Sequence, residues 1–147
     1  MSITNLMMLE PLLQARLQEQ LADITPKVHV LAASDLAGVT EATQVTPAVH
    51  LLYRRYMITE SRADGRAARM EQSWLAVVAT RNVRNLRSGA AARADAGLIA
   101  RRVASALMGF VPALGIKPLR LTTAPDAGNS GGYQYLPLAF ATELVLD

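Results

Sequence analysis

The sequence predicts an α+β fold, a mainly antiparallel β-sheet with two α-helices packed on one face, in a single domain that spans residues 1–147. Two segments show the three- and four-residue spacing of apolar residues that is typical of amphipathic helices, and several apolar or alternating runs have the period of strands. The order helix, strand, hairpin, helix, strand, strand favours helices laid on a sheet. The length of 147 residues fits one such domain.

The first helix is expected between Leu6 and Ile24, where leucines recur with polar residues on the opposite face. Pro11 is compatible only with a first helical turn, in which a missing N–H costs nothing, so we expect the regular helix to begin near Glu10. Pro26 follows its end.

The second helix is expected from Ala91 to about Leu114, because Ile99, Val103, Leu107 and Phe110 share one stripe with Leu114. Pro112 and Gly115 mark its frayed end.

Strands are expected in five stretches with β-branched, apolar or alternating residues: Val28–Ala33, Pro47 to about Ile58, about Met70–Thr80, Leu119–Thr123 and Tyr133–Asp147. The second and third form a hairpin whose loop, residues 59–69, is unusually long. Residues 123–132, rich in Gly, Asp and Asn, are expected to be a flexible loop. Pro137 cannot donate to a ladder, so it must lie at an edge, a bulge or the first turn of the last strand.

The composition excludes several classes of site. The chain has no cysteine, so disulfides, thiolate zinc sites and a cysteine nucleophile are excluded. No apolar run approaches the roughly 18–20 residues of a membrane span, and the first residues lack a basic leader region. We therefore expect a protein of cytoplasm-like conditions with no membrane partner.

The charges are distributed unevenly along the sequence. Residues 54–102 hold eleven of the thirteen arginines and only four acidic residues, whereas the rest of the chain has four basic and eight acidic residues. The formal net charge of +3 hides this difference. The distribution predicts a charge-polarised molecule that contacts a partner.

Arginines at two predicted connections are the candidate interface residues, for contacts with a neighbouring subunit or another protein: Arg62, Arg66, Arg69, Arg81, Arg84, Arg87 and Arg93. Arginine suits a bidentate grip on carboxylate or phosphate. An acidic protein partner and a merely solvated loop explain the run from 81 to 93 equally well. Nucleic acid is a third interpretation, and no aromatic residue is interleaved there to stack on bases.

We expect no catalytic residue, metal or cofactor. His29 and His50 each stand alone in an apolar strand and fit sheet histidines with one hydrogen bond. The stretch Gly128–Gly132 lacks the lysine of a phosphate-binding loop and leads into a strand. The serines lack a Gly-x-Ser-x-Gly context, and the nearby carboxylates alternate with arginines as salt-bridge partners would: Glu60, Asp64 and Glu71.

The whole-chain pattern resembles the tail-terminator (tail-completion) proteins of long-tailed bacteriophages. The similarity rests on the amphipathic N-terminal helix, the strand Pro47-Ala48-Val49-His50-Leu51, the strand that runs from Trp74 to Asn82, the helix at 91–110 and the closing stretch from Gly132 to Phe140. This resemblance covers most of the chain and includes no catalytic signature.

The resemblance implies a ring, with six copies, on the head-proximal end of the tail tube, where it stops tube polymerisation and offers a surface to neck proteins. Such a protein is part of the virion tail, is assembled in the host cytoplasm, and surrounds a bore through which genome DNA passes without sequence-specific binding. A ring needs two different complementary surfaces on each subunit. A head-completion or neck connector protein is the nearest alternative, and a nucleic-acid-binding module is an alternative from another class.

Overall fold

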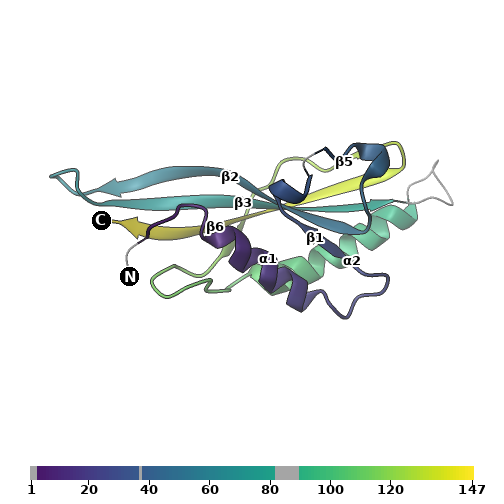
Figure 1. The fold of residues 1–147 in the computed structure, drawn as a ribbon, viewed down its shortest axis with the longest axis horizontal. Coiled ribbons are helices and arrows are strands. Elements are labelled where there is room, and N and C mark those ends of the chain that lie inside the picture. The colour runs from purple at the N-terminus through teal and green to yellow at the C-terminus, as the bar shows by residue number, and fades with distance from the viewer. Residues whose placement is uncertain (1–2, 37, 82–89) are drawn as a thin grey trace.

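The computed structural model describes residues 3–36, 38–81 and 90–147 (Figure 1). The elements follow in this order: α1 (Leu9–Gln20), β1 (His29–Leu31), the short 3-10 helices η1 (Ala33–Leu36) and η2 (Glu41–Thr43), β2 (Ala48–Ser61), β3 (Ala68–Arg81), α2 (Ala90–Leu107), β4 (Arg120–Thr122), β5 (Gly128–Ser130) and β6 (Tyr133–Leu146). As predicted, the proline of α1, Pro11, lies in its first turn.

The sheet confirms the predicted mainly antiparallel α+β architecture. Its strands lie in the order β1-β2-β3-β6-β4, and β5 pairs with β6. The three long strands form antiparallel pairs, whereas β1 runs parallel to its neighbour, β2. The central strand β3 pairs along its whole length with β6, from Ala68 opposite Leu146 to Arg81 opposite Tyr133.

Both helices pack on one face of the sheet, as predicted (Figure 1). The core between them centres on Trp74 of β3, which is 1% exposed and makes an edge-on ring contact with Tyr53 of β2. The alternation of β6 places Phe140 beside Trp74 on this face. The leucines of α1 and the apolar stripe of α2 complete the core: Leu9, Leu13, Leu17, Ile99, Val103 and Leu107.

The hairpin between β2 and β3 has a shorter loop than predicted. The strands continue to Ser61 and from Ala68, so the predicted loop 59–69 is strand at both ends and only residues 62–67 form the turn. Polar cross-strand contacts support the added pairs, because Glu60 is opposite Arg69 and forms an ion pair with it. Strands that are exposed on both faces lack the apolar alternation that marks a strand in a sequence.

The second helix ends at Leu107 and not near Leu114 as predicted. Gly109 has a φ of +78°, and its N–H donates to the carbonyl of Leu119 at 2.8 Å. A glycine with positive φ just beyond a helix turns the chain away, although the apolar spacing continues through Phe110.

The glycine-rich stretch 123–132 contains a strand, contrary to the prediction of a flexible loop. Residues 128–130 form β5, which is joined to β6 by Gly131 and Gly132, with φ values of +58° and +85°. Two positive φ angles in a two-residue hairpin are typical of a type I′ turn, for which Gly-Gly is a suitable sequence. Pro137 lies between the residues of β6 that pair with β5 and those that pair with β4, where its missing N–H leaves no strand bond unmade.

The long strands extend well beyond the helices. Each of β2, β3 and β6 has 14 residues, which at about 3.3 Å per residue is roughly 46 Å. The 18 residues of α2 span only about 27 Å. The β2–β3 hairpin and the end of β6 therefore project from the helix-covered part of the molecule (Figure 1).

We expect Trp74→Ala to lower the free energy of unfolding by about 3–5 kcal/mol, because the indole is fully buried at the centre of the core. Urea unfolding followed by circular dichroism measures this loss. Leu114→Ala is the matched control, since Leu114 is also a large apolar residue but is 82% exposed. Equal unfolding midpoints for the two variants would contradict the position assigned to Trp74.

Candidate interaction surfaces

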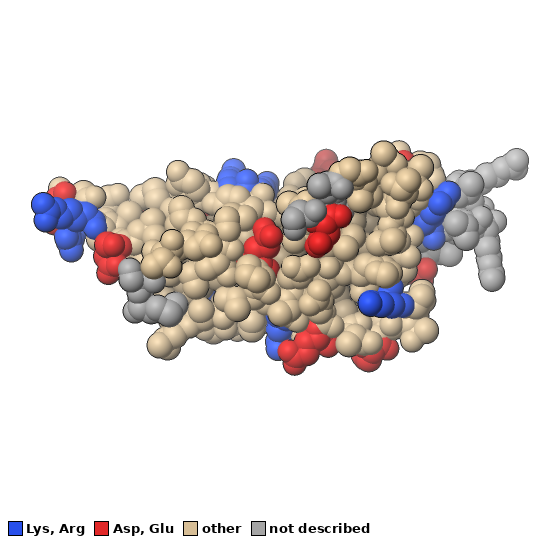
Figure 2. Space-filling view, in the orientation of Figure 1, with Lys and Arg blue, Asp and Glu red and all other residues tan. Residues whose placement is uncertain are grey.

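The structure separates the predicted arginine interface into two ends of the molecule. Arg62, Arg66 and Arg69 lie at or beside the turn between β2 and β3. Arg81 ends β3, twelve residues from Arg69 along the same strand, a separation of about 40 Å. Figure 2 shows basic side chains at both ends of the long axis. The described members of the set therefore cannot act as one patch on one subunit.

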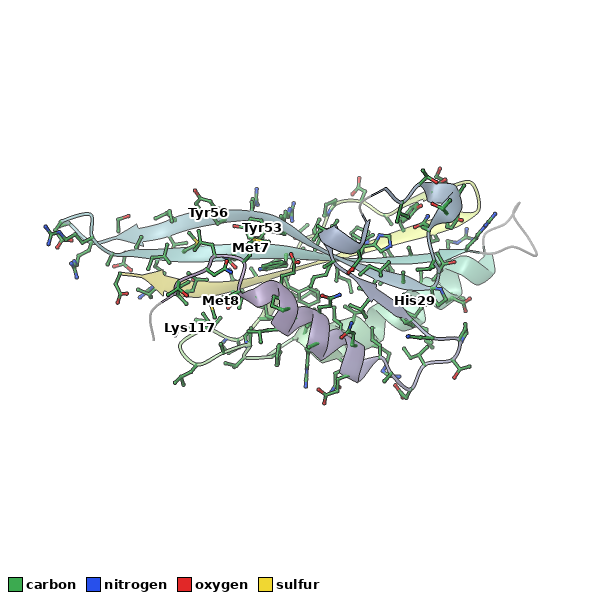
Figure 3. The ribbon with its side chains drawn as sticks, in the orientation of Figure 1. Met7, Met8, His29, Tyr53, Tyr56 and Lys117 are labelled. Carbon is green, nitrogen blue, oxygen red and sulfur yellow. The ribbon has the colours of Figure 1, made fainter. Side chains whose placement is uncertain are left out.

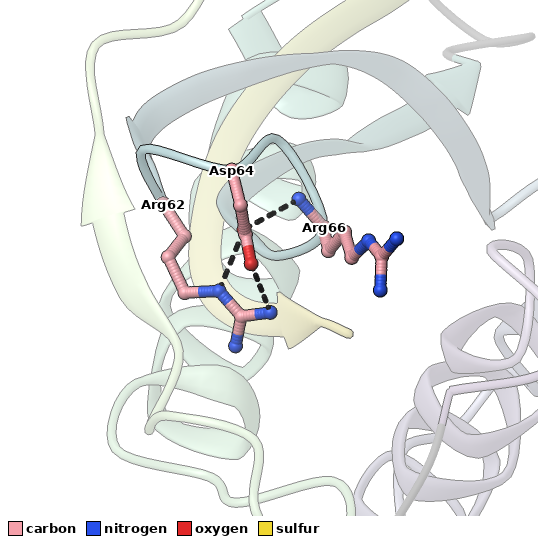
Figure 4. A network of polar contacts seen from close by, with 3 residues as sticks. All are labelled: Arg62, Asp64 and Arg66. Atoms are coloured by element: carbon pink, nitrogen blue, oxygen red, sulfur yellow. Dashed lines mark hydrogen bonds and ion pairs between the residues drawn. The ribbon is translucent and has the colours of Figure 1, made fainter.

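The hairpin turn, residues 62–67, is held by a carboxylate. Asp64 accepts two hydrogen bonds from the Arg62 guanidinium, at 2.7 and 2.8 Å, and a third from the backbone N–H of Arg66 at 3.0 Å (Figure 4). The bonds from Arg62 lower the pKa of the Asp64 carboxyl below its usual value. Gly65, with a φ of +73°, provides the left-handed residue of the turn.

Arg66 is the arginine of this turn whose guanidinium is directed away from the carboxylate. Arg62 and Arg69 form ion pairs with Asp64 and Glu60, whereas the ion pairs among the described residues do not include Arg66. Its charge is exposed at the far end of the projecting hairpin. Of the predicted residues at this end, Arg66 is therefore the best placed to contact another molecule.

At the opposite end, Arg81 lies beside a cavity of about 510 Å³. Its guanidinium stacks over the ring of Tyr133 at 4.8 Å from the centroid. The lining is partly apolar, with Leu98 and Ile99 of α2, and includes the carboxylate of Asp95. Arg93 is exposed near the start of α2. Arg84 and Arg87 lie outside the described residues.

Two other arginines of the basic window, Arg54 and Arg102, make bonds within the subunit. Arg102 of α2 donates to the carbonyl of Gln20, at the end of α1, and forms an ion pair with Asp23 at 2.6 Å. Arg54 donates to the carbonyl of Thr123. The uneven charge along the sequence therefore overstates the basic surface that is free for a partner.

Sequence reasoning missed an exposed apolar segment on the projecting strand β2. Tyr56, Met57 and Ile58 are 53%, 50% and 46% exposed. Figure 3 shows Tyr53 and Tyr56 on this strand. The signal was present in the sequence, because three consecutive large apolar residues give a strand two apolar faces.

The two histidines lie in strands, as predicted. His50 is half-buried, and burial lowers the pKa of its imidazole, so the ring is neutral at pH 7. Its buried Nε2 has no hydrogen-bond partner in the described part of the chain. Within residues 3–36, 38–81 and 90–147, no group of three or more acidic or histidine side chains could hold a metal ion, and no helix could cross a membrane.

Comparison with known proteins agrees with the resemblance. No curated protein matches the sequence. The model of one family, described as phage tail terminator protein, matches residues 4–147, which is nearly the whole chain. The chain belongs to the phage tail terminator protein family, and its role is that of a structural component of a bacteriophage tail.

Proposed function

We propose that this chain forms a ring, of six copies, that caps the head-proximal end of the tail tube. The ring stops polymerisation of the tube and provides the attachment surface for a head-completion or neck protein. The observation that carries this proposal is the family match over residues 4–147. Genome DNA passes through the bore of the ring without sequence-specific contacts, and the chain acts by fit between surfaces and not by catalysis.

The shape of the subunit supports a ring. The two ends of the chain differ, because one is a projecting hairpin with Arg66 at its tip and the other is a helix-covered end with a cavity of about 510 Å³. In a ring whose axis follows the strands, one end of every copy lies above the ring and the other end lies below it. Such a ring can contact the tail tube on one side and a head-completion or neck protein on the other. Closed cyclic assembly also needs two different complementary surfaces on each subunit.

The length of tail tubes tests the proposed capping. We expect tail tube protein to form long tubes of variable length alone, and shorter tubes with a ring at one end when the chain is added. Electron microscopy measures both the lengths and the rings. Tubes of unchanged length, together with binding of the chain to filled heads, would instead support the head-completion alternative.

We expect Arg66→Glu to weaken assembly on the tube or between subunits by about ten-fold in apparent affinity, because it reverses a charge exposed on the hairpin tip. The melting temperature should stay within about 2 °C, since surface substitutions of this kind change stability by less than about 0.5 kcal/mol. Analytical ultracentrifugation and a tube-binding assay measure the affinities.

The control for Arg66→Glu is Arg101→Glu, which makes the same change in net charge on the exposed side of α2. Equal weakening by both variants would show that net charge, and not the hairpin tip, is responsible. Unchanged assembly of Arg66→Glu would remove the tip from the set of contacts.

A further inference from the structure

One side of strand β2 is an open sheet edge over most of its length. Strand β1 pairs only with residues 48–50 of β2. In the described part of the chain, no strand pairs with the outer side of β2 from Leu51 to Ser61. The segment Tyr56–Ile58 on this edge exposes about half of each large apolar side chain, on both faces of the sheet. Apolar residues on both faces are typical of a strand inside a sheet.

A second open edge lies on the other side of the same sheet. Strand β4 pairs only with residues 139–141 of β6. Beyond them, among the described residues, the backbone contact on the outer side is the bond from the Lys117 N–H to the Glu143 carbonyl, at 3.1 Å. Val145, two residues further along, is 48% exposed. Backbone groups alternate sides along a strand, so the N–H and C=O of Val145 point outward like those of Glu143.

The two open edges are at the same level of the molecule and differ in charge. Met70 of β3 pairs with Ile58 on one side and with Leu144 on the other. The open segment of β2, residues 51–61, carries two arginines and one glutamate, whereas residues 142–147 carry Glu143 and Asp147 and no basic residue. Opposite charges on the two edges favour contact between them and disfavour contact of either edge with itself.

We propose that the occupant of the β2 edge is a second copy of this chain, which adds the end of its β6 strand and so continues the sheet from one subunit to the next. This inference rests on the proposed ring and names its contact. Within a subunit β2 and β6 run in the same direction, because each is antiparallel to β3. In a ring whose axis follows the strands, the pairing between copies is therefore parallel.

The register indicates which backbone groups make the contact. Leu144 directs its N–H and C=O toward β3, because its neighbour Glu143 directs them outward. Its partner Met70 therefore directs its own N–H and C=O toward β6 and away from β2. Ile58, which is paired with Met70 on the β2 side, directs its backbone groups away from β3, to the open edge. A proline at position 58 or 145 removes an outward N–H without removing a bond to β3.

Two proline variants with opposite blocked edges test the pairing. Val145→Pro keeps an intact β2 edge, and Ile58→Pro keeps an intact β6 edge. We expect each variant alone to be monomeric, and an equimolar mixture to form a dimer of twice the subunit mass, because one intact junction remains. Val145→Thr and Ile58→Thr, which retain the N–H, are the matched controls and should still form rings. Light scattering measures the masses, and circular dichroism confirms the fold.

Three results would overturn the edge pairing: rings formed by either proline variant, a mixture of folded variants that stays monomeric, or a dimer of Val145→Pro alone, which would indicate pairing of β2 with β2. If a proline variant does not fold, amide hydrogen exchange on the wild-type ring decides. The amides of residues 58 and 145 should exchange about ten-fold or more slowly after assembly, and unchanged rates would refute the proposal.

The failure of the proposed function and the failure of the edge pairing give different results. A wild-type chain that forms no ring, free or on tubes, contradicts the proposed function. Rings that persist in both proline variants contradict only the edge pairing.

Discussion

The structure depends on a difference in length between its strands and its helices. Trp74 and Phe140 fix the middle of the sheet beneath α1 and α2, and this core is continuous from the first leucines of α1 to the end of α2. A strand rises more than twice as far per residue as a helix, so 14-residue strands cannot be covered by helices of 12 and 18 residues. The uncovered part becomes a projecting hairpin on which Tyr56, Met57 and Ile58 are about half exposed. The hairpin tip and the open strand edges proposed for assembly follow from this excess of strand.

The length of the strands also explains where the arginines lie in the molecule. Arginines that are close in sequence, Arg69 and Arg81, are separated by the length of one strand, so a basic segment of sequence becomes two distant basic sites. Between these sites the chain uses arginines for internal bonds, of which the bond from Arg102 to the end of α1 is the clearest. A charge count along the sequence says how many arginines a segment contains, whereas a binding surface requires them to be close together in the folded chain. In a protein built from long strands, arginines that are near in sequence can be far apart in space.

Much of the fold could be predicted because burial leaves a periodic signal. The leucines of α1, the apolar stripe of α2 and the alternation of β6 are each fixed by one buried face, and these elements occur where the sequence places them. The errors occur where burial gives no signal. The strand residues that were predicted as loop are mostly polar, namely residues 59–61 of β2 and Arg69 of β3. Strand β5 pairs through the backbone of Gly128–Ser130, and Gly109 sets the end of α2 while the apolar spacing continues. The family could be recognised from the overall pattern. The division of the arginines between two ends of the molecule could not be predicted, because it depends on the lengths of the strands.

A projecting apolar edge strand is a hazard for a protein that is isolated, since unpaired N–H and C=O groups beside apolar side chains promote aggregation. The chain limits this hazard in part. Register shifts on each side of the segment Arg55–Ile58, at Arg54 and Thr59, interrupt the regular pairing of β2 with β3, and Arg55 places a charge at the start of the segment. The segment Tyr56–Ile58 between the two shifts keeps its apolar side chains, although a single lysine there would protect the edge at little cost to folding. The proposed ring would remove the hazard in another way, because each open edge of one copy would be covered by the opposite edge of the next. An edge that is protected at both ends and left open in the middle is what a subunit requires if it must stay soluble alone and pair in one register when assembled.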